Sequence, residues 1–329
     1  MNLTGGPTPT PVPGKEPTHR TGHHSATTSA DRRHCALLSR GLDEPLPATA
    51  PPGTGSWLAV EHRGPWPTRP TDACLPAPAS AVLRAAEALG IRTQLIRRPD
   101  RRRPATTWHT VLVAAHVHGQ PWLERANLPD LAALRGLDLA TLAQGHAPGF
   151  GTPTARPQVL VCTHGRHDAC CAQLGRPTAV AAATAHPGRV WETTHLGGDR
   201  FAGNLACLPH GTYHGRVTAT TAATVTAACL AGRVHLPHYR GRAGLPGPAQ
   251  AAEHAVRVAT GLTHVDAVAV EGVEQVATMA LVRLRAGSQR LAVPVRTVST
   301  GPPRPTACAG CTLDTPTSYV TGTPYPLPR

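Results

Sequence analysis

The junction between an apolar run at Gln158–Cys162 and a helix pattern at about 169–185 constrains the fold of this chain more than any other segment. The apolar run is typical of a buried strand. Cys162 ends it, and Cys171 falls in the first turn of the helix. A thiolate at a helix start is stabilised by unpaired backbone N–H groups and by the helix dipole, which lower its pKa. The junction therefore predicts a βα unit with metal-ligating or reactive thiols at its turn.

Further elements place this junction in an α/β unit at residues 154–240. A β-type segment is expected at Arg189–Thr194, strands of a hairpin at Asn204–Leu208 and Thr212–Val217, and a closing helix at Thr220–Leu230. This order fits a small thioredoxin-type sheet.

Residues 31–153 predict another α/β unit. Its expected strands and helices are Ser56–Glu61, Ala79–Leu89, Ile91–Ile96, Thr107–Ala115 and the amphipathic Leu128–Leu142. The two units share a rough element order. The order strand, helix, strand, strand, helix implies an α/β sandwich.

Three flanking segments complete the expected organisation. Residues 1–30 have almost no large apolar side chain and are expected to be disordered. Residues 241–300 predict a small α+β unit, with a helix at Pro248–Thr260 followed by alternating strands. Residues 301–329 are proline-rich and expected to be loosely ordered.

Cysteine usage favours metal or redox chemistry. The chain shows no secretory signal pattern and no apolar run long enough to span a bilayer, so we expect a cytoplasmic protein, in which disulfide frameworks are rare. Residues 155–240 contain five of the nine cysteines and eight histidines, but only three carboxylates. This block is rich in soft and borderline metal ligands.

The formal charge of +13 carries less information than its size suggests. Lys15 is the only lysine, and abundant Ala, Gly, Pro and Arg are what a GC-rich coding sequence produces. The densest basic run, Arg97–Arg103, has no interleaved aromatic residue and is expected to be a solvated loop. Nucleic acid is therefore not an expected partner.

Three motifs in the central unit belong together. The first is Cys162-Thr-His-Gly-Arg-His-Asp-Ala-Cys-Cys171, and the second runs from Thr194 through His195-Leu-Gly-Gly-Asp199 to Asn204. Glycines in the second motif allow the backbone to pass close to a bulky object. The third motif is Leu208–Val217, a segment of Pro, His, Gly, Thr, Tyr and Arg. Together these motifs resemble the sucrase/ferredoxin-like family, and segments around Cys35 and Trp57–Trp66 extend the resemblance over residues 33–245.

The resemblance implies a thioredoxin-like ferredoxin whose [2Fe–2S] cluster is held by two cysteines and by two histidines of an HxxxH motif. It implies Cys162 and Cys171 on one iron and His195 on the other. The second family histidine is replaced here by Asp199, a harder, anionic group that would favour the ferric state. The role of Asp199 stays open. It could be the fourth ligand, it could contact a ligand without binding iron, or it could pair with Arg200 in a protein without a cluster.

The expected fold class is α/β, with a thioredoxin-like ferredoxin domain preceded by a related α/β unit and followed by a small α+β unit. The expected function is electron transfer to an unidentified redox partner protein, with a homodimer left open and no membrane association. A cluster-free thiol oxidoreductase using Cys162 or Cys171 is the first alternative, and a non-enzymatic polyanion-binding module is the second. A glycosidase is rejected, because it needs paired carboxylates and aromatic platforms, and aromatic residues form only 3% of the chain.

The remaining cysteines and one histidine have simpler expectations. Cys170 and Cys171 point apart on a helix, so one is expected to bind the cluster and the other to pack. His164 either bonds to a cluster sulfur or is a plain turn residue. Cys207 and Cys229 lie on apolar faces and are expected in the core. The role of the single CxxC pair formed by Cys308 and Cys311 is left open.

Overall fold

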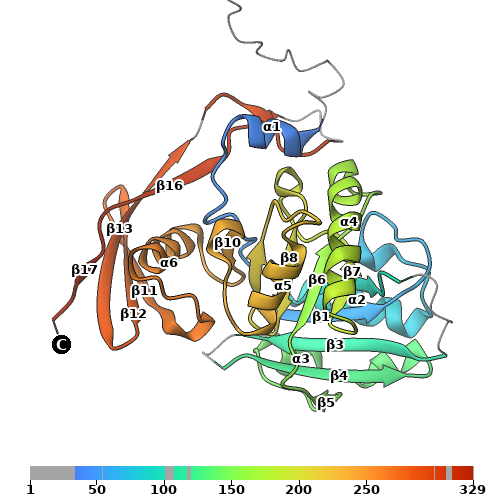
Figure 1. Cartoon of the computed structure of the whole chain (residues 1–329). Coiled ribbons are helices and arrows are strands. Elements are labelled where there is room, and N and C mark those ends of the chain that lie inside the picture. The colour runs from blue at the N-terminus through green and yellow to red at the C-terminus, as the bar shows by residue number, and fades with distance from the viewer. Residues whose placement is uncertain are drawn as a thin grey trace, which may run out of the picture.

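The computed structural model describes residues 34–53, 55–100, 107–116, 120–299, 301–308 and 313–328. Within these residues a ten-stranded mixed sheet forms the centre of the molecule, in the order β10-β9-β8-β6-β7-β2-β1-β3-β4-β5 (Figure 1). Its strands are β1 (Ser56–Glu61), β2 (Arg92–Arg97), β3 (His109–Ala115), β4 (Trp122–Leu128), β5 (Thr152–Pro153), β6 (Gln158–Cys162), β7 (Val190–Thr193), β8 (Leu205–Leu208), β9 (Thr212–His214) and β10 (Tyr239–Arg242). The α/β class is therefore as predicted.

The large sheet is built from two halves with the same strand order. β1 and β2 are parallel and joined by α2 (Ala77–Ala88), and β3 and β4 follow antiparallel on the other side of β1. β6 and β7 are likewise parallel and joined by α4 (Ala169–Ala185), and β8 and β9 follow antiparallel beside β6. The halves meet where β2 pairs antiparallel with β7. The rough likeness in element order thus corresponds to a likeness in topology.

The C-terminal part forms a separate sheet packed against a helix. This sheet has the order β11-β12-β13-β16, with β17 also paired to β13, and α6 packs on it (Figure 1). The stretch at 301–329, expected to be loosely ordered, supplies β16 and β17 to this sheet. The elements are α6 (Gly247–Thr260), β11 (Val268–Val276), β12 (Met279–Ala286), β13 (Gln289–Ser299), β16 (Thr317–Thr321) and β17 (Tyr325–Pro326).

The short elements complete the fold. β14 and β15 pair with each other only in a two-stranded ribbon. The bounds are α1 (Cys35–Gly41), α3 (Leu139–Ala143), α5 (Ala222–Leu230), β14 (Arg304–Pro305), β15 (Leu313–Asp314) and the 3₁₀ helices η2 (Pro70–Asp72), η4 (Leu131–Gly136), η5 (Asp199–Phe201), η6 (Leu236–His238) and η7 (Val265–Ala267). Among the residues that the structure describes, no helix combines the length and apolar character needed to cross a membrane.

The helix expected at Leu128–Leu142 is wrong as a single element. Leu128 ends strand β4, and the remainder forms the two short helices η4 and α3. Asp138 interrupts the pattern because its carboxylate accepts the backbone N–H groups of Ala140 and Thr141 and so begins a new helix. Leucine periodicity alone does not reveal this second cap.

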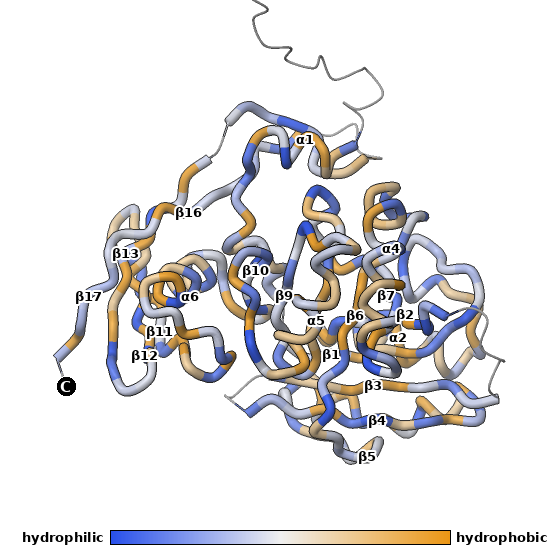
Figure 2. The backbone as a smooth tube through the Cα atoms, viewed as in Figure 1, coloured by the Kyte–Doolittle hydropathy of each residue, from blue (hydrophilic) through white to orange (hydrophobic). Residues whose placement is uncertain are grey.

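Apolar side chains cover both faces of the central strands. Figure 2 shows β3 and β6 coloured largely as hydrophobic, and both are buried along most of their length.

Part of the basic run Arg97–Arg103 packs against aromatic rings. Arg97 stacks on Trp66 with its guanidinium carbon 3.9 Å from the ring centroid, and Arg98 stacks on Trp191 at 3.4 Å. These two arginines therefore have structural contacts, while residues 101–103 of the run lie outside the described residues.

Candidate metal centre

Strand β6 and helix α4 bring two cysteines together. Cys162 is the last residue of β6, and Cys171 lies in the first turn of α4. The helix begins there because Asp168 caps it, accepting the backbone N–H of Cys170 at 2.8 Å. One turn further along α4, Gly175 presses against the carbonyl group of Cys162, where an added Cβ would collide with the oxygen. The glycine lets the helix approach the strand closely enough for both thiols to lie in one buried site.

The turn between β7 and η5 is shaped by two glycines. Gly197 and Gly198 have φ angles of +91° and +77°, in the left-handed region that favours glycine. A Cβ on Gly197 would meet Pro51, and one on Gly198 would meet the guanidinium group of Arg240. The bulky neighbours that require these glycines are therefore protein side chains.

Arg240 holds this turn in place. Its guanidinium group donates hydrogen bonds to the Gly197 carbonyl at 2.9 Å, to Asn204 Oδ1 at 2.8 Å and to Thr49 Oγ1 at 3.0 Å. Arg240 is buried, and burial lowers its pKa to about 9. Its role could not be read from the motifs, because it lies on β10, outside all three.

The four side chains singled out from the sequence converge at these two turns. The ligand atoms of Cys162, Cys171 and His195 all lie within 4.8 Å of one another. Asp199 joins them, since it accepts a hydrogen bond from Cys171 Sγ at 3.2 Å and its Oδ1 is 3.0 Å from His195 Nδ1. The structure therefore brings together all four candidate ligands.

His167 also lies in this site, although the motif assigned it no role. Its ring stacks on that of His195 with the centroids 3.7 Å apart. Its Nε2 lies 3.7 Å from Asp199 Oδ2. Its position in the first motif marked the loop, but the contact with His195 depends on how the two turns pack.

Two alternatives left open by the sequence are decided by contacts. Arg200 pairs with Glu44, with Nε 2.7 Å from Oε1, and so points away from the thiols. His164 donates from Nε2 to the carbonyl of Pro67 at 2.8 Å and accepts the backbone N–H of His195 at Nδ1 at 3.3 Å. Its ring thus supports the turn that carries His195.

The charges at the site follow from these contacts. The neighbouring Cys171 thiol, together with His195, holds the pKa of the Cys162 thiol well below its usual range, whereas Cys162 and burial raise the pKa of Cys171. Burial lowers the pKa of His195, but its contacts with Asp199 and Cys162 outweigh burial and raise the pKa to about 9. Burial likewise opposes ionisation of Asp199, but His195 outweighs it and lowers the pKa of that carboxyl. These contacts therefore shift Cys162, His195 and Asp199 toward their charged forms.

The donor set fits a metal centre. Thiolate and imidazole are ligands of iron–sulfur clusters and of zinc. His195 Nδ1 is buried and faces Asp199 Oδ1 at 3.0 Å. Two thiols and an imidazole whose ligand atoms lie within 4.8 Å of one another, with a carboxylate in contact, are suited to coordinate a metal.

Five of the other seven cysteines fall into three classes. Cys207 and Cys229 are buried in the core beside β6 and α5, which confirms their prediction. Cys170 turns away from Cys171 and contacts Cys308, with the two sulfur atoms 3.2 Å apart. Cys311, the second residue of the CxxC pair, lies outside the described residues.

Comparison with known proteins identifies one related family. The family model described as Suc_Fer-like, sucrase/ferredoxin-like, matches residues 54–241, which is more than half of the chain and includes all four candidate ligands. No curated protein and no solved structure matches the chain.

Proposed function

Because the chain belongs to the sucrase/ferredoxin-like family and groups Cys162, Cys171, His195 and Asp199 at one site, we propose that it is an electron-transfer protein that holds a [2Fe–2S] cluster. The observation that carries the proposal is the convergence of two buried thiols with the imidazole of His195 and the carboxylate of Asp199. Such ligands hold [2Fe–2S] centres in which histidine replaces cysteine on one iron.

Each residue has a definite role in this proposal. Cys162 and Cys171 would hold one iron, and His195 and Asp199 the other. The cluster would supply one-electron redox chemistry. His164 supports the backbone of His195, and Arg240 supports the glycine turn.

The exposure of the ligands favours electron exchange through the imidazole side of the site. Both thiols are buried, whereas the His195 and His167 side chains are 23% and 32% exposed. A redox partner protein would therefore dock over the two stacked histidines. We place the protein in the cytoplasm and leave a homodimer open.

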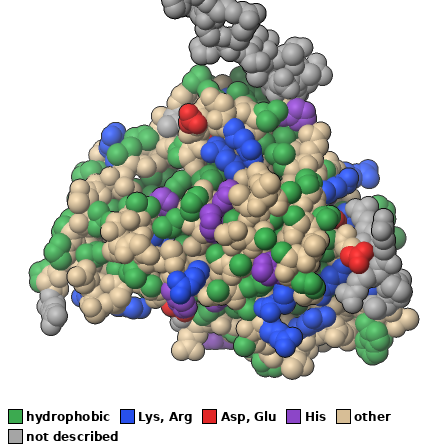
Figure 3. Space-filling model, in the orientation of Figure 1, with side chains coloured by type: hydrophobic (Ala, Val, Ile, Leu, Met, Phe, Trp, Pro, Cys, Tyr) green, Lys and Arg blue, Asp and Glu red, His purple; other side chains and the backbone are tan. Residues whose placement is uncertain are grey.

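The distribution of basic side chains gives less support to polyanion binding. On the face in Figure 3, Lys and Arg side chains form several groups separated by apolar and other side chains. Arg97, Arg98 and Arg240 are engaged in packing or in internal hydrogen bonds. Electron transfer is therefore favoured over a nucleic-acid module.

Metal analysis of anaerobically purified protein tests the proposal. We expect iron and acid-labile sulfide in the equal proportion that a [2Fe–2S] cluster requires, with visible charge-transfer absorbance that bleaches on reduction by dithionite. If the protein contains no iron, sulfide or visible absorbance when purified, and gains none on cluster reconstitution, the proposal of a [2Fe–2S] protein is wrong.

A thiol oxidoreductase remains the second candidate, because Cys162 is a stabilised thiolate beside His195. Its burial counts against it, since a reactive thiol needs access to its substrate. Rapid alkylation of Cys162 at about pH 6, where an ordinary thiol is protonated, would favour this candidate over the cluster protein.

We expect Asp199→His to keep the cluster and to raise its reduction potential. An anionic carboxylate stabilises the ferric state, and a neutral imidazole removes that stabilisation. The reduction potential should therefore rise by on the order of 100 mV and become pH-dependent. A redox titration followed by visible absorbance measures this shift. Asp266→His is the control, because Asp266 is an exposed carboxylate of η7. An unchanged spectrum and potential would show that Asp199 is not a ligand.

A further inference from the structure

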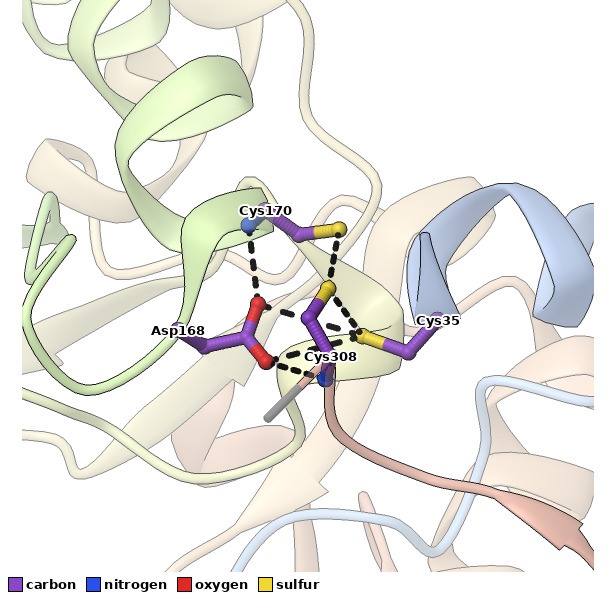
Figure 4. Close-up of side chains that lie close together, drawn as sticks. All are labelled: Cys35, Asp168, Cys170 and Cys308. Carbon is purple, nitrogen blue, oxygen red and sulfur yellow. Dashed lines mark hydrogen bonds between the residues drawn. The ribbon is translucent and has the colours of Figure 1, made fainter. Parts of the chain in front are cut away.

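A second group of metal-ligating side chains lies beside the first and uses none of its proposed ligands. Cys35 from α1, Asp168 and Cys170 from the start of α4, and Cys308 from the C-terminal segment point toward one another (Figure 4). Their ligand atoms all lie within 4.8 Å of one another. We propose that these four side chains form a zinc site.

The carboxylate of Asp168 is buried at the centre of this group and faces all three sulfur-bearing residues. Its side chain is almost fully buried, and its two oxygens accept the backbone N–H groups of Cys170 at 2.8 Å and Cys308 at 2.6 Å. Within the described part of the chain, no ion pair with Lys, Arg or His involves this carboxylate. Buried charges in proteins are paired or coordinate metals, and a cation among the three neighbouring sulfurs would satisfy this requirement.

The ligand atoms lie close enough together to surround a single tetrahedral ion after small shifts of the side chains. At a Zn–S distance of about 2.3 Å, two thiolates on tetrahedral zinc lie about 3.8 Å apart. Cys308 Sγ lies 3.2 Å from Cys170 Sγ and 3.6 Å from Cys35 Sγ. Cys35 Sγ lies 3.9 Å from each oxygen of Asp168. The sulfur atoms are too far apart for a disulfide, in which they are bonded at about 2.05 Å.

The donor set favours zinc in a structural role. Three thiolates and one carboxylate provide four protein ligands, and closed four-coordinate sites of this kind are structural rather than catalytic. The contacts join segments that are 138 and 273 residues apart along the chain. An ion at this point would fasten α1 and the C-terminal segment to the start of α4 (Figure 4), and its binding energy would contribute to folding.

The two sites adjoin, because the ligand atoms of Asp168, Cys171 and Asp199 also lie within 4.8 Å of one another, but the sulfur atoms of Cys170 and Cys171 face different groups. Cys171 Sγ donates to Asp199 in the first site, whereas Cys170 Sγ lies 3.2 Å from Cys308 in the second. Because successive side chains of a helix point in different directions, one helical turn serves both groups. Variants at these residues can therefore distinguish zinc binding from cluster binding.

Elemental analysis of the full chain tests the proposal. We expect about one zinc ion per chain after zinc reconstitution, and its loss from both Cys35→Ser and Cys308→Ser. Cys74→Ser is the matched control, because Cys74 is an exposed cysteine outside both groups. The Cys74→Ser protein should keep its zinc. Cys171→Ser should also keep its zinc.

Cobalt binding provides a readout that does not depend on the first site. Co²⁺ added to metal-free Cys171→Ser should give thiolate charge-transfer and tetrahedral d–d absorption, and both should disappear in the Cys171→Ser/Cys308→Ser double variant. Cys308 lies outside the large sheet, so circular dichroism of its variant should show an intact fold. Failure of the reconstituted wild type to bind zinc would overturn the proposal. So would zinc retained by the Cys171→Ser/Cys308→Ser double variant at the level of Cys171→Ser, or a Cys170–Cys308 disulfide found by mass spectrometry in place of zinc.

Discussion

Replacing Cys171 with serine should remove iron, acid-labile sulfide and visible absorbance from the protein. Its sulfur lies in the buried group with Cys162 and His195 and contacts Asp199 at 3.2 Å, and it is one of the two thiols of that group. A serine hydroxyl remains protonated at neutral pH and supplies no soft anionic donor. We expect the iron content to fall by at least about tenfold, as loss of even outer partners of metal ligands lowers affinity by 10–100-fold. Elemental analysis and absorbance spectroscopy measure the loss.

Cys207→Ser is the matched control for this experiment. Cys207 lies on β8 next to β6 and is as deeply buried as Cys171, but it belongs to the apolar core. Both variants introduce a hydroxyl into the interior, so a difference in iron content reports ligation rather than general destabilisation. Iron, sulfide and absorbance retained in Cys171→Ser would contradict the proposed ligand set.

Replacing Gly175 with alanine should destabilise the protein and lower its iron content together. The new Cβ would collide with the backbone carbonyl oxygen of Cys162, which cannot rotate away as a flexible side chain could. Alanine is favoured over glycine in a helix by about 1 kcal/mol, whereas overpacking a tight contact costs about 1–3 kcal/mol or more. The collision should therefore dominate, and denaturant unfolding followed by circular dichroism should show a lower free energy of unfolding. Because α4 carries Cys171, moving the helix away from β6 would also separate the two thiols.

Gly136→Ala controls for the removal of a glycine as such. An added Cβ on Gly136, at the end of η4, meets nothing within 4 Å. Its free energy of unfolding and its iron content should stay close to those of the wild type. Equal stability of the Gly136 and Gly175 variants would show that α4 can move without cost and would remove the packing argument.

Local patterns predicted the elements whose signals agree with one another. The strand at Ser56–Glu61 and the helix at 169–185 occur where the sequence placed them, because each combines a clear apolar pattern with definite ends. The helix expected at Leu128–Leu142 failed because Asp138 caps a new helix inside the apolar pattern. A side-chain hydrogen bond to the backbone is a local event, but hydrophobic periodicity does not record it.

The pairing of the two halves lay beyond sequence patterns. Similar element orders suggested related units, but nothing in either order indicated that β2 would pair with β7 in one continuous sheet. This junction is reinforced by an ion pair between Arg97 and Glu192 at 2.6 Å. Such edge pairing depends on the complementary placement of two finished units.

The sequence by itself determined the first group through its motifs and the family that they resemble, which implied Cys162, Cys171 and His195 as ligands. The structure agrees with that set because Cys162 and Cys171 flank one strand-to-helix turn, and the turn with His195 and Asp199 follows the adjacent parallel strand. Only the tertiary structure decided that Asp199 faces the thiols rather than Arg200, because both orientations are open to an isolated turn.

Tertiary structure alone also revealed the group of Cys35, Asp168, Cys170 and Cys308. Their contacts span up to 273 residues, and no periodicity or spacing links positions so far apart. Closing such distances is opposed by chain entropy, so these side chains meet only after α1, α4 and the C-terminal segment have packed. Motifs of residues close together in the sequence can therefore predict the first site, whereas the second can be recognised only from the folded structure.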